Sequence, residues 1–374
     1  MADFSHISLL IDLDCEWWLP APATFTDTAT YFPKRSARLV HESIHYWQQL
    51  SHGYLLRLAD EDWHQLLEWE SGGHASTGPI REKFKRPQGV HGFSASDLSE
   101  CLARFWEVLY VGPDIVLRNA AAAARRASPT GEVPESLAKL AGLELPTAET
   151  VELAMKLSGR YSLPFAVVRR VVGLPDVIFV FPFLAHFALK TTQPVQFFDR
   201  FLTEASLRLV DAAKEIGISA WDSDLVVQLY ALARRCCREI VETDGDEMLD
   251  APSLHATTGL ADNPAYVWPF QQLARLSVEA GPWALDDPAA NIDASICLPA
   301  FEQARALLVA RLTPPCLRFR DRQILALGEL VRSSWLSSTP DEIDAAETAA
   351  QAVLDTHARW ENFQDRLRQN TFRN

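Results

Sequence analysis

Apolar residues recur at helical spacing along most of this 374-residue chain, and this pattern constrains the fold more than any other feature of the sequence. The segment 94–111 opens with Ser94 and Asp97, which resemble a capping box. Further helices are expected at 121–126, 134–142, 147–158, 162–190, 195–216, 220–243, 264–281, 298–312, 318–337 and 340–370. Breaks fall at Pro, Gly and Asp-Asn clusters. We therefore expect a mainly α protein that ends in one long helix.

The N-terminal region departs from this pattern. Residues 7–17 alternate between apolar and polar with a period near two, which predicts a strand. Ser36 is a plausible N-cap, and the spacing after it predicts a helix to about Leu58, with a short second helix at 61–69. The segment 71–94 is rich in Gly, Ser, Pro and charge and predicts a long surface loop.

The composition excludes several classes of protein. The chain has 35 Lys plus Arg against 49 Asp plus Glu, and the net charge of −14 disfavours binding to nucleic acid or to anionic lipid. With 48% apolar and 22% charged residues, it can bury a large core. The six cysteines form no CxxC pair and have no regular spacing, which argues against a zinc ribbon or a disulfide framework.

The chain shows no sign of a targeting or membrane segment. Its N-terminus lacks a basic region, and Asp12 and Asp14 interrupt the apolar stretch there, so a signal peptide is not indicated. The longest apolar run, 174–189, is shorter than the roughly 20 residues needed to cross a bilayer. We expect a cytoplasmic protein with no membrane and no nucleic-acid partner, in which this run is a core helix.

Residues 41–45 read His-Glu-Ser-Ile-His, an HExxH motif inside the first predicted helix. Four residues turn a helix by about 400°, so His41 and His45 project from nearly the same face and can bind one metal ion. The Glu42 carboxylate beside them can take a proton from water activated by that ion. Shuffled sequences of this composition contain roughly 0.02 such motifs each, so chance explains it poorly. The structural alternative is a pair of hydrogen-bonded buried histidines, with Glu42 paired to an arginine.

A catalytic zinc site needs a third protein ligand. The histidine of the HExxHxxGxxH pattern is missing, because position 51 is serine, and His52 lies roughly 16 Å along the helix axis from the first histidine of the motif. A glutamate of the helix at 94–111 remains, with Glu100 as the candidate and Glu107 as the fallback. The small Ala103 between them favours a close helix crossing. The alternative for Glu100 is an exposed first-turn glutamate favoured by the helix dipole.

The HExxHxxQ helix, here His41, Glu42, His45 and Gln48, followed by a helix of the form E-x-x-A-x-x-x-E, here Glu100, Ala103 and Glu107, resembles uncharacterised bacterial zincin-like proteins of the gluzincin type. The stretch FPFLAHFALKTTQPVQFF is also similar to their central helices. The resemblance covers about the first 110 residues and about 20 near Pro182. It implies that His41, His45 and Glu100 bind zinc and that Glu42 is the base. Such families usually have Gly or Ser where this chain has Cys101.

Two other groupings compete with this site. The pairs Glu42-x-x-His45 and Glu61-x-x-His64 suggest a di-iron carboxylate site, although Glu61 follows the first helix almost directly. A second set of residues could stabilise oxyanion charge, but these residue types are more often hydrogen-bonded in a core. That set is Tyr161, His186 and His255.

Taken together, these observations predict a mainly α metalloenzyme. Residues 1–112 would form a metal-binding zincin-like part with a small β element, and residues 113–374 a larger helical part that completes the cleft. We expect a peptidase-like or amidase-like hydrolase that uses one Zn²⁺ on a peptide or small-molecule substrate. One alternative is a mononuclear non-haem Fe(II) oxygenase with Fe²⁺ on the same ligands, acting on a peptide or small metabolite. The other is a catalytically inactive zincin-shaped binding protein. The sequence leaves the oligomeric state open.

Overall fold

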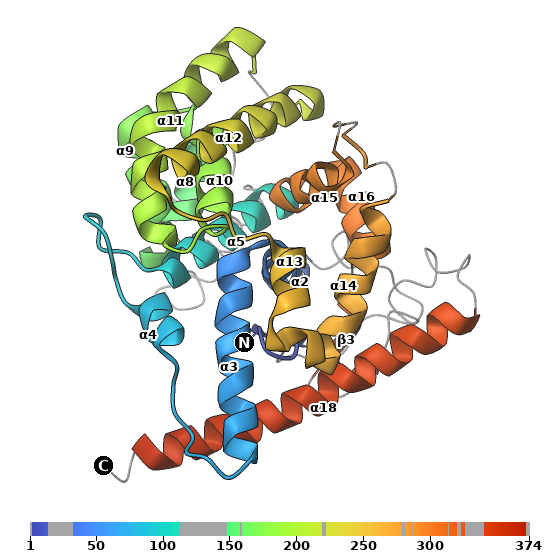
Figure 1. Ribbon diagram of the computed structural model, residues 1–374. Coiled ribbons are helices and arrows are strands. Elements are labelled where there is room, and N and C mark those ends of the chain that lie inside the picture. Colours follow the sequence, from blue (N-terminus) through green and yellow to red (C-terminus); the bar gives the residue numbers. More distant parts are fainter. Residues whose placement is uncertain are drawn as a thin grey trace, which may run out of the picture.

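The computed structural model describes residues 2–13, 33–112, 148–157, 159–218, 222–278, 281–283, 285, 287–312, 314–319, 323–325 and 340–371. Over these residues the protein is mainly helical with one small sheet, which confirms the expected class (Figure 1). The expected helices at 121–126 and 134–142, the strand end at 15–17 and the stretch 326–337 lie outside them. No helix in these ranges has the length and apolar character needed to cross a membrane.

The sheet joins the two ends of the chain. Its strands, in spatial order, are β1 (Ala2–Ser5), β2 (Leu10–Leu13), β3 (Cys316–Phe319) and β4 (Gln323–Leu325). β1 and β2 form an antiparallel hairpin, and β2 runs parallel to β3, with Asp12 opposite Arg318, 306 residues further along the chain. The sheet therefore crosses the division between residues 1–112 and 113–374.

Two predictions in these regions are wrong. Residues 7–9, expected to begin a single strand, lie in the turn of the hairpin, where Leu9 has a φ of 59° and its N–H donates to the Ser5 carbonyl at 2.7 Å. The alternation misleads because Ile7, Ser8 and Leu10 are all fully buried, whatever their polarity. The helix expected at 318–337 begins instead as strand, because its first residues complete the sheet.

The HExxH motif lies on α2 (Pro33–Ser51), which is followed at once by α3 (Gly53–Glu70). The expectation of one helix from Ser36 to about Leu58 and a second at 61–69 is therefore wrong in its division. α2 begins earlier and breaks at His52, where the backbone is extended with φ −94° and ψ 107°, and α3 then runs through both segments as one helix. Packing explains the break. A Cβ atom on Gly53 would lie 2.2 Å from the Cβ atom of Leu249, so only glycine permits this close approach.

The segment expected as a long loop contains a short helix, α4 (Pro79–Lys85). Glu61 on α3 accepts hydrogen bonds from the backbone N–H groups of Ile80 and Arg81, each at 2.9 Å. Its carboxylate thus satisfies the free N–H groups at the start of α4 and complements the helix dipole. The local pattern missed α4 because this cap comes from α3 and not from the segment itself.

The helix α5 (Ala95–Val111) begins where its capping box predicts. The Asp97 N–H donates to Ser94 Oγ at 3.1 Å, and the Ser94 N–H donates to the Asp97 carboxylate at 2.9 Å. α5 packs along α2, and Ala103 is fully buried. The capping box therefore sets the start of the helix that carries Glu100.

The other helices form the body around α10 (Val177–Ala188), every residue of which is buried. The helix expected at 162–190 is two helices, separated after Gly173, which has a φ of 80°. Neither α13 nor α15 was expected. The bounds are α8 (Ala148–Lys156), η1 (Gly159–Ser162), α9 (Leu163–Val172), α11 (Pro194–Ile216), α12 (Ser223–Asp244), α13 (Ala251–Thr257), η2 (Gly259–Asp262), α14 (Pro264–Leu276), α15 (Pro288–Cys297) and α16 (Glu302–Arg311).

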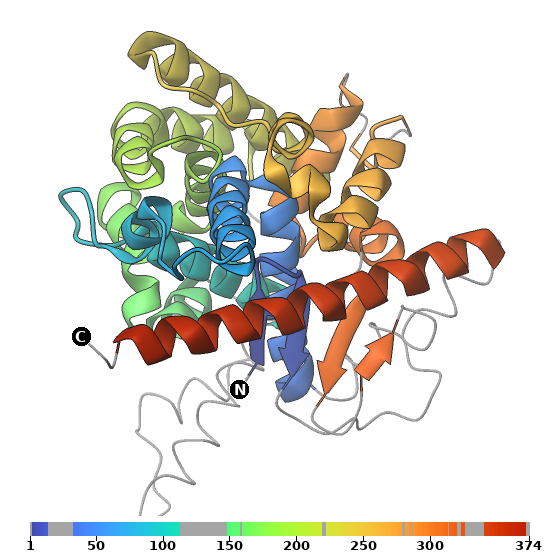
Figure 2. The same cartoon turned by 60° about the horizontal axis from the view of Figure 1, so that its bottom comes forward.

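The last helix, α18 (Pro340–Thr371), is the single long helix that the sequence predicts. It crosses the sheet and contacts β2, β3, β4, α3 and α14 (Figure 2). A stripe of buried apolar side chains holds it there: Ala346, Ala349, Ala350, Val353, Trp360 and Phe363. The C-terminal helix thus lies next to the N-terminal hairpin.

Candidate metal centre

α2 directs both histidines of the motif to one point. The Nε2 atoms of His41 and His45 are 3.1 Å apart, as the spacing of four residues predicts. The rotation of α2 about its axis is set by buried side chains on its other faces, among them Ile44, Trp47 and Leu50, each at most 2% exposed. Burial of these apolar groups therefore turns the two imidazoles toward α5.

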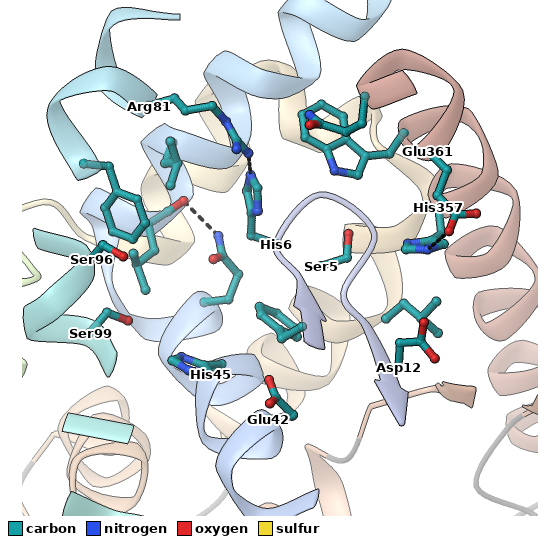
Figure 3. Close-up of a pocket in the computed structure, with 18 of the residues that line it drawn as sticks. Ser5, His6, Asp12, Glu42, His45, Arg81, Ser96, Ser99, His357 and Glu361 are labelled. Atoms are coloured by element: carbon teal, nitrogen blue, oxygen red, sulfur yellow. Dashed lines mark hydrogen bonds and ion pairs between the residues drawn. The ribbon is translucent and has the colours of Figure 1, made fainter. Parts of the chain in front are cut away.

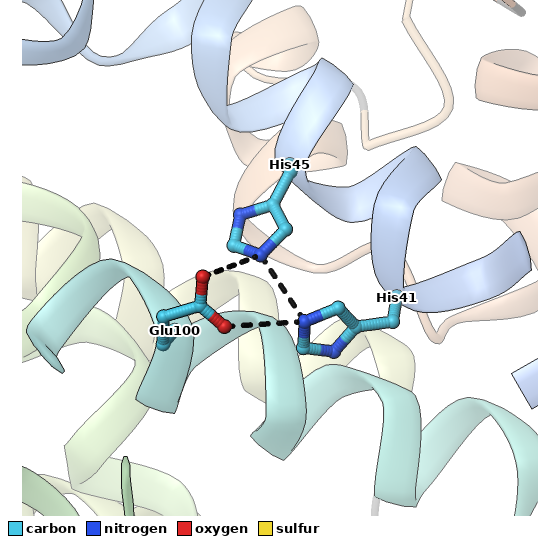
Figure 4. Close-up of side chains that lie close together, drawn as sticks. All are labelled: His41, His45 and Glu100. Atoms are coloured by element: carbon cyan, nitrogen blue, oxygen red, sulfur yellow. Dashed lines mark hydrogen bonds and ion pairs between the residues drawn. The ribbon is translucent and has the colours of Figure 1, made fainter. Parts of the chain in front are cut away.

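Glu100 reaches the same point from α5. One of its carboxylate oxygens lies 3.4 Å from His41 Nε2 and the other 3.5 Å from His45 Nε2 (Figure 4). Ligand atoms of the three residues all lie within 4.8 Å of one another. Within the described ranges, no other group of three or more His, Cys, Asp or Glu side chains converges in this way. Of the two glutamates that the sequence leaves open, the structure brings Glu100 to the Nε2 atoms.

The spacing of these atoms fits one metal ion. Two atoms that bind an ion at about 2.1 Å in tetrahedral geometry are about 3.4 Å apart. The two Nε2 atoms are 3.1 Å apart, and each faces a different oxygen of the Glu100 carboxylate, at 3.4 Å from His41 and 3.5 Å from His45. Two imidazoles and a carboxylate are a ligand set of catalytic zinc sites, and they leave a fourth position for water or substrate. The same set also binds Fe(II) in non-haem oxygenases.

Glu107 supports the ring of His41 from the side opposite Glu100. Its carboxylate lies 3.0 Å from His41 Nδ1, so Nδ1–H donates to Glu107 and Nε2 is the ring atom that faces Glu100. Arg104 forms an ion pair with the other oxygen of Glu107. Burial acts to raise the pKa of Glu107, but the hydrogen bond from His41 and the charge of Arg104 lower it overall. Glu107 is thus an ionised acceptor that selects the tautomer a metal ligand requires.

Gln48 has the same relationship to His45. Its Oε1 atom lies 3.0 Å from His45 Nδ1 and accepts a second hydrogen bond, at 2.9 Å, from the Ser99 hydroxyl. The Gln48 amide nitrogen donates to the Ser99 carbonyl at 3.3 Å, which fixes the orientation of the amide. Nδ1 of His45 must therefore be the donor to Gln48, and its Nε2 is the atom that faces the cluster.

The electrostatics of the cluster favour positive charge. Burial acts to lower the pKa of His41, but hydrogen bonds to Glu100 and Glu107, together with the charges of Glu107 and Glu42, raise it to about 10. Burial acts to raise the pKa of Glu100, yet the charge of His45 and the hydrogen bonds from both histidines lower it well below its usual range. Either a proton or a divalent cation can neutralise this group of carboxylates, and a cation would displace the proton.

Glu42 lies beside the cluster in a cavity of about 880 Å³, which Glu100 also lines. Figure 3 shows Glu42 and His45 at this cavity. The Glu42 side chain is buried. The Phe4 ring of the hairpin stacks over the His45 ring, with centroids 6.3 Å apart. The cavity volume lies in the range of sites for small ligands, roughly 300 to 1,000 Å³. Further lining residues come from the hairpin, α4 and α18, among them Ser5, His6, Arg81, His357, Glu361 and Gln364.

His52, which the sequence excludes as a ligand, belongs to a separate buried network. Its Nε2 atom lies 2.9 Å from His186 Nδ1, and His186 Nε2 lies 3.2 Å from Asp293. Asp293 also accepts hydrogen bonds from Tyr230 and Lys190. Burial lowers the pKa of both histidines. His186, a candidate for oxyanion stabilisation, is therefore used in the core.

The remaining sequence candidates also lie outside the cluster. Glu61 caps α4, and the His64 side chain is 60% exposed, so the second ExxH pair does not join the first to form a di-iron arrangement. Tyr161 is exposed. His255 stacks on Phe270 with ring centroids 4.0 Å apart.

Sequence reasoning missed the part of the cavity that the chain ends supply. His6 lies before the motif and His357 far beyond it, and neither belongs to a recognisable pattern. They line the same cavity because β2 pairs with β3 and α18 packs over the sheet. No signal in the sequence indicates this pairing.

Comparison of the chain with family models, with curated proteins and with solved structures gave no match. The function therefore has to be argued from the geometry of His41, His45, Glu100 and Glu42, and from the cavity beside them.

Proposed function

We propose that the protein is a metal-dependent hydrolase of amide-type bonds, with zinc held by His41, His45 and Glu100. The observation that carries the proposal is the convergence of their ligand atoms within 4.8 Å at the wall of a cavity that Glu42 also lines. Each histidine has an Nδ1 partner that leaves Nε2 free for a ligand bond. A support of this kind for the ring nitrogen opposite the metal is characteristic of metal sites.

Glu42 has the position of a general base. A bound zinc ion would polarise the scissile carbonyl and bring the pKa of a water molecule in its open position toward neutrality. The Glu42 carboxylate, one residue after His41 and facing the cavity, can accept the proton of the attacking water and deliver it to the leaving nitrogen. Its burial excludes bulk water, which strengthens electrostatic interactions in the site.

The Fe(II) oxygenase with the same ligands is the second candidate, because two imidazoles and one carboxylate are also an iron site. The buried carboxylate of Glu42 favours hydrolysis, which requires a base at this place. An inactive binding protein would need neither that carboxylate nor the oriented histidines.

The proposal is tested with zinc-loaded protein and a tryptic digest of casein in H₂¹⁸O. Hydrolysis produces new peptide termini that carry ¹⁸O, which mass spectrometry detects. Glu42→Gln should keep the metal and lose at least about 100-fold in rate, because an amide cannot accept the proton. Glu204→Gln, an exposed position on α11, is the matched control and should behave as the wild type.

Two results would count against this mechanism. Unchanged turnover in Glu42→Gln would remove Glu42 as the base. Loss of metal together with turnover would make Glu42 a ligand instead.

A further inference from the structure

Charged side chains from α4, β2, β3 and α18 line the cavity away from the His41, His45 and Glu100 cluster, and this part of the lining is called the far wall. These charged groups largely form ion pairs. The pairs are Arg81 with Asp62, Arg318 with Asp12, Arg318 with Glu361 and Arg368 with Asp365, at N to O distances of 2.5, 2.5, 3.3 and 3.1 Å. Lys85, another cation of this wall, is exposed, so solvent screens its charge. No described cation of the wall is therefore both buried and free to bind an anionic ligand.

The two histidines of this wall add no charge. Burial lowers the pKa of His6, although its hydrogen bond to the Asp62 carboxylate acts to raise it, and burial also lowers the pKa of His357. Both are also engaged in the protein, His6 with Asp62 at 2.6 Å and His357 with the Ser8 hydroxyl at 3.1 Å. The wall is thus close to electrically neutral.

Two uncharged groups of the same cavity are left without a partner. Ser5 Oγ on the hairpin and Gln364 Nε2 on α18 are buried atoms with no hydrogen-bond partner among the described residues. Both residues line the cavity, the hairpin and α18 being shown around it in Figure 3. A buried polar group without a partner is unfavourable, and such groups in a cavity indicate where a ligand binds.

We propose that an uncharged, amide-bearing segment of the substrate binds between the hairpin and α18, with Gln364 donating to a carbonyl oxygen and Ser5 pairing with a neighbouring amide group. The inference rests on the proposed function, because this segment belongs to the molecule whose bond lies beside Glu42. A blocked or internal stretch of a short peptide has this chemistry. A terminal carboxylate or a phosphate would need a free buried cation, and the wall offers none within its described residues.

The test uses full-length, zinc-loaded protein with Glu42→Gln, so that ligands bind without turnover. Two pools of tetrapeptides with randomised side chains serve as probes, one with acetylated and amidated ends and one with free ends. Mass spectrometry after equilibrium filtration measures retention of each. We expect the blocked pool to be retained about fivefold or more over the free pool, as the loss of solvation of an unpaired charge disfavours the latter.

The binding position is tested in the same background. Gln364→Leu should weaken retention of the blocked pool about 3- to 10-fold, the value of one lost neutral hydrogen bond. Gln369→Leu, the same change at an exposed position of the same helix, is the control and should have no effect. Ser5→Ala provides a second variant that removes little volume, and circular dichroism verifies that each variant is folded.

The outcomes separate the two proposals. Three results would overturn the inference on the ligand. They are preference for the free-ended pool, retention of neither pool, and equal retention of the blocked pool by Glu42→Gln protein with and without Gln364→Leu. Blocked peptides that bind through Gln364 but are never hydrolysed by the zinc-loaded wild type would support this inference and defeat the hydrolase.

Discussion

The Nδ1 atom of His41 lies 3.0 Å from a carboxylate oxygen of Glu107, on the side of the ring opposite Glu100. From the sequence, Glu107 is the fallback for the third metal ligand. In the structure it contacts the His41 ring and is itself held by Arg104. Its expected role is therefore to orient His41 and to raise the basicity of Nε2.

Glu107→Gln should weaken zinc binding about 10-fold, at the lower end of the 10- to 100-fold range for such supporting residues, because the amide keeps an acceptor but loses the charge. Competition with a zinc chelator measures the affinity. Glu204→Gln is the matched exposed control. An affinity equal to that of the wild type would show that Glu107 is only a structural partner of Arg104.

Gln48 holds the His45 ring directly and Ser99 holds it through Gln48, so their removal should weaken zinc binding to different extents. Gln48→Leu removes the acceptor for His45 Nδ1 and should weaken zinc binding about 10- to 100-fold, whereas Ser99→Ala removes only the hydroxyl that orients the amide and should have a smaller effect. The same chelator competition measures both. An effect of Ser99→Ala larger than that of Gln48→Leu would contradict the proposed order of contacts.

The capping box at the start of α5 should contribute to stability and to the site. Ser94→Ala removes the acceptor for the Asp97 N–H and should lower the free energy of unfolding by about 1 kcal/mol. Urea unfolding measures this change. Ser253→Ala, an exposed position in α13, provides a serine control that should change stability less. An equal loss of unfolding free energy in the two variants would mean that the Ser94 cap stabilises the fold no more than an exposed serine does.

Asp62 should make stability depend on pH on the acid side. Burial acts to raise its pKa, but the hydrogen bonds from His6 and Arg81 lower it below the ordinary value of 3.8. A carboxyl with a depressed folded-state pKa stabilises the fold above its unfolded-state pKa, and this stability is lost as pH falls through the folded-state pKa. Asp62→Asn should therefore cost about 2 to 3 kcal/mol near pH 7 and progressively less below about pH 4.

Urea unfolding between pH 2 and pH 7 provides the measurement. Glu204→Gln breaks an exposed pair with Arg200 and should cost less than about 1 kcal/mol. A constant difference between wild type and Asp62→Asn at all these pH values would rule out the ionised carboxylate as the source of the effect.

Local patterns were sufficient for much of the fold. The capping box of Ser94 and Asp97 marks the start of α5, and helical spacing predicts α11, α12 and α18. The break at His52 could not be predicted, because it depends on the approach of Gly53 to Leu249, almost 200 residues away. The pairing of β2 with β3 could not be predicted either, because parallel pairing of distant segments leaves no local periodicity in the sequence.

The candidate site was also predictable only in part. The positions of His41 and His45 follow from helical geometry, and Glu100 is the candidate that remains once His52 and a metzincin histidine are excluded, with Glu107 as the fallback. The roles of Glu107 and Gln48 could not be predicted, because they depend on side-chain conformations where α2 and α5 pack together. Ser5 and Gln364 were not predictable, because they come from opposite ends of the chain and line the same cavity only through tertiary packing.

The metal content of protein purified without added metal tests the central claim most directly. Elemental analysis of the wild type should find about one equivalent of zinc per chain, and His41→Ala and His45→Ala should each lose most of it, because two remaining ligands are too few for a catalytic zinc site. Glu204→Gln should retain the wild-type amount. A wild type without stoichiometric metal, or a full equivalent retained by His41→Ala, would contradict the account.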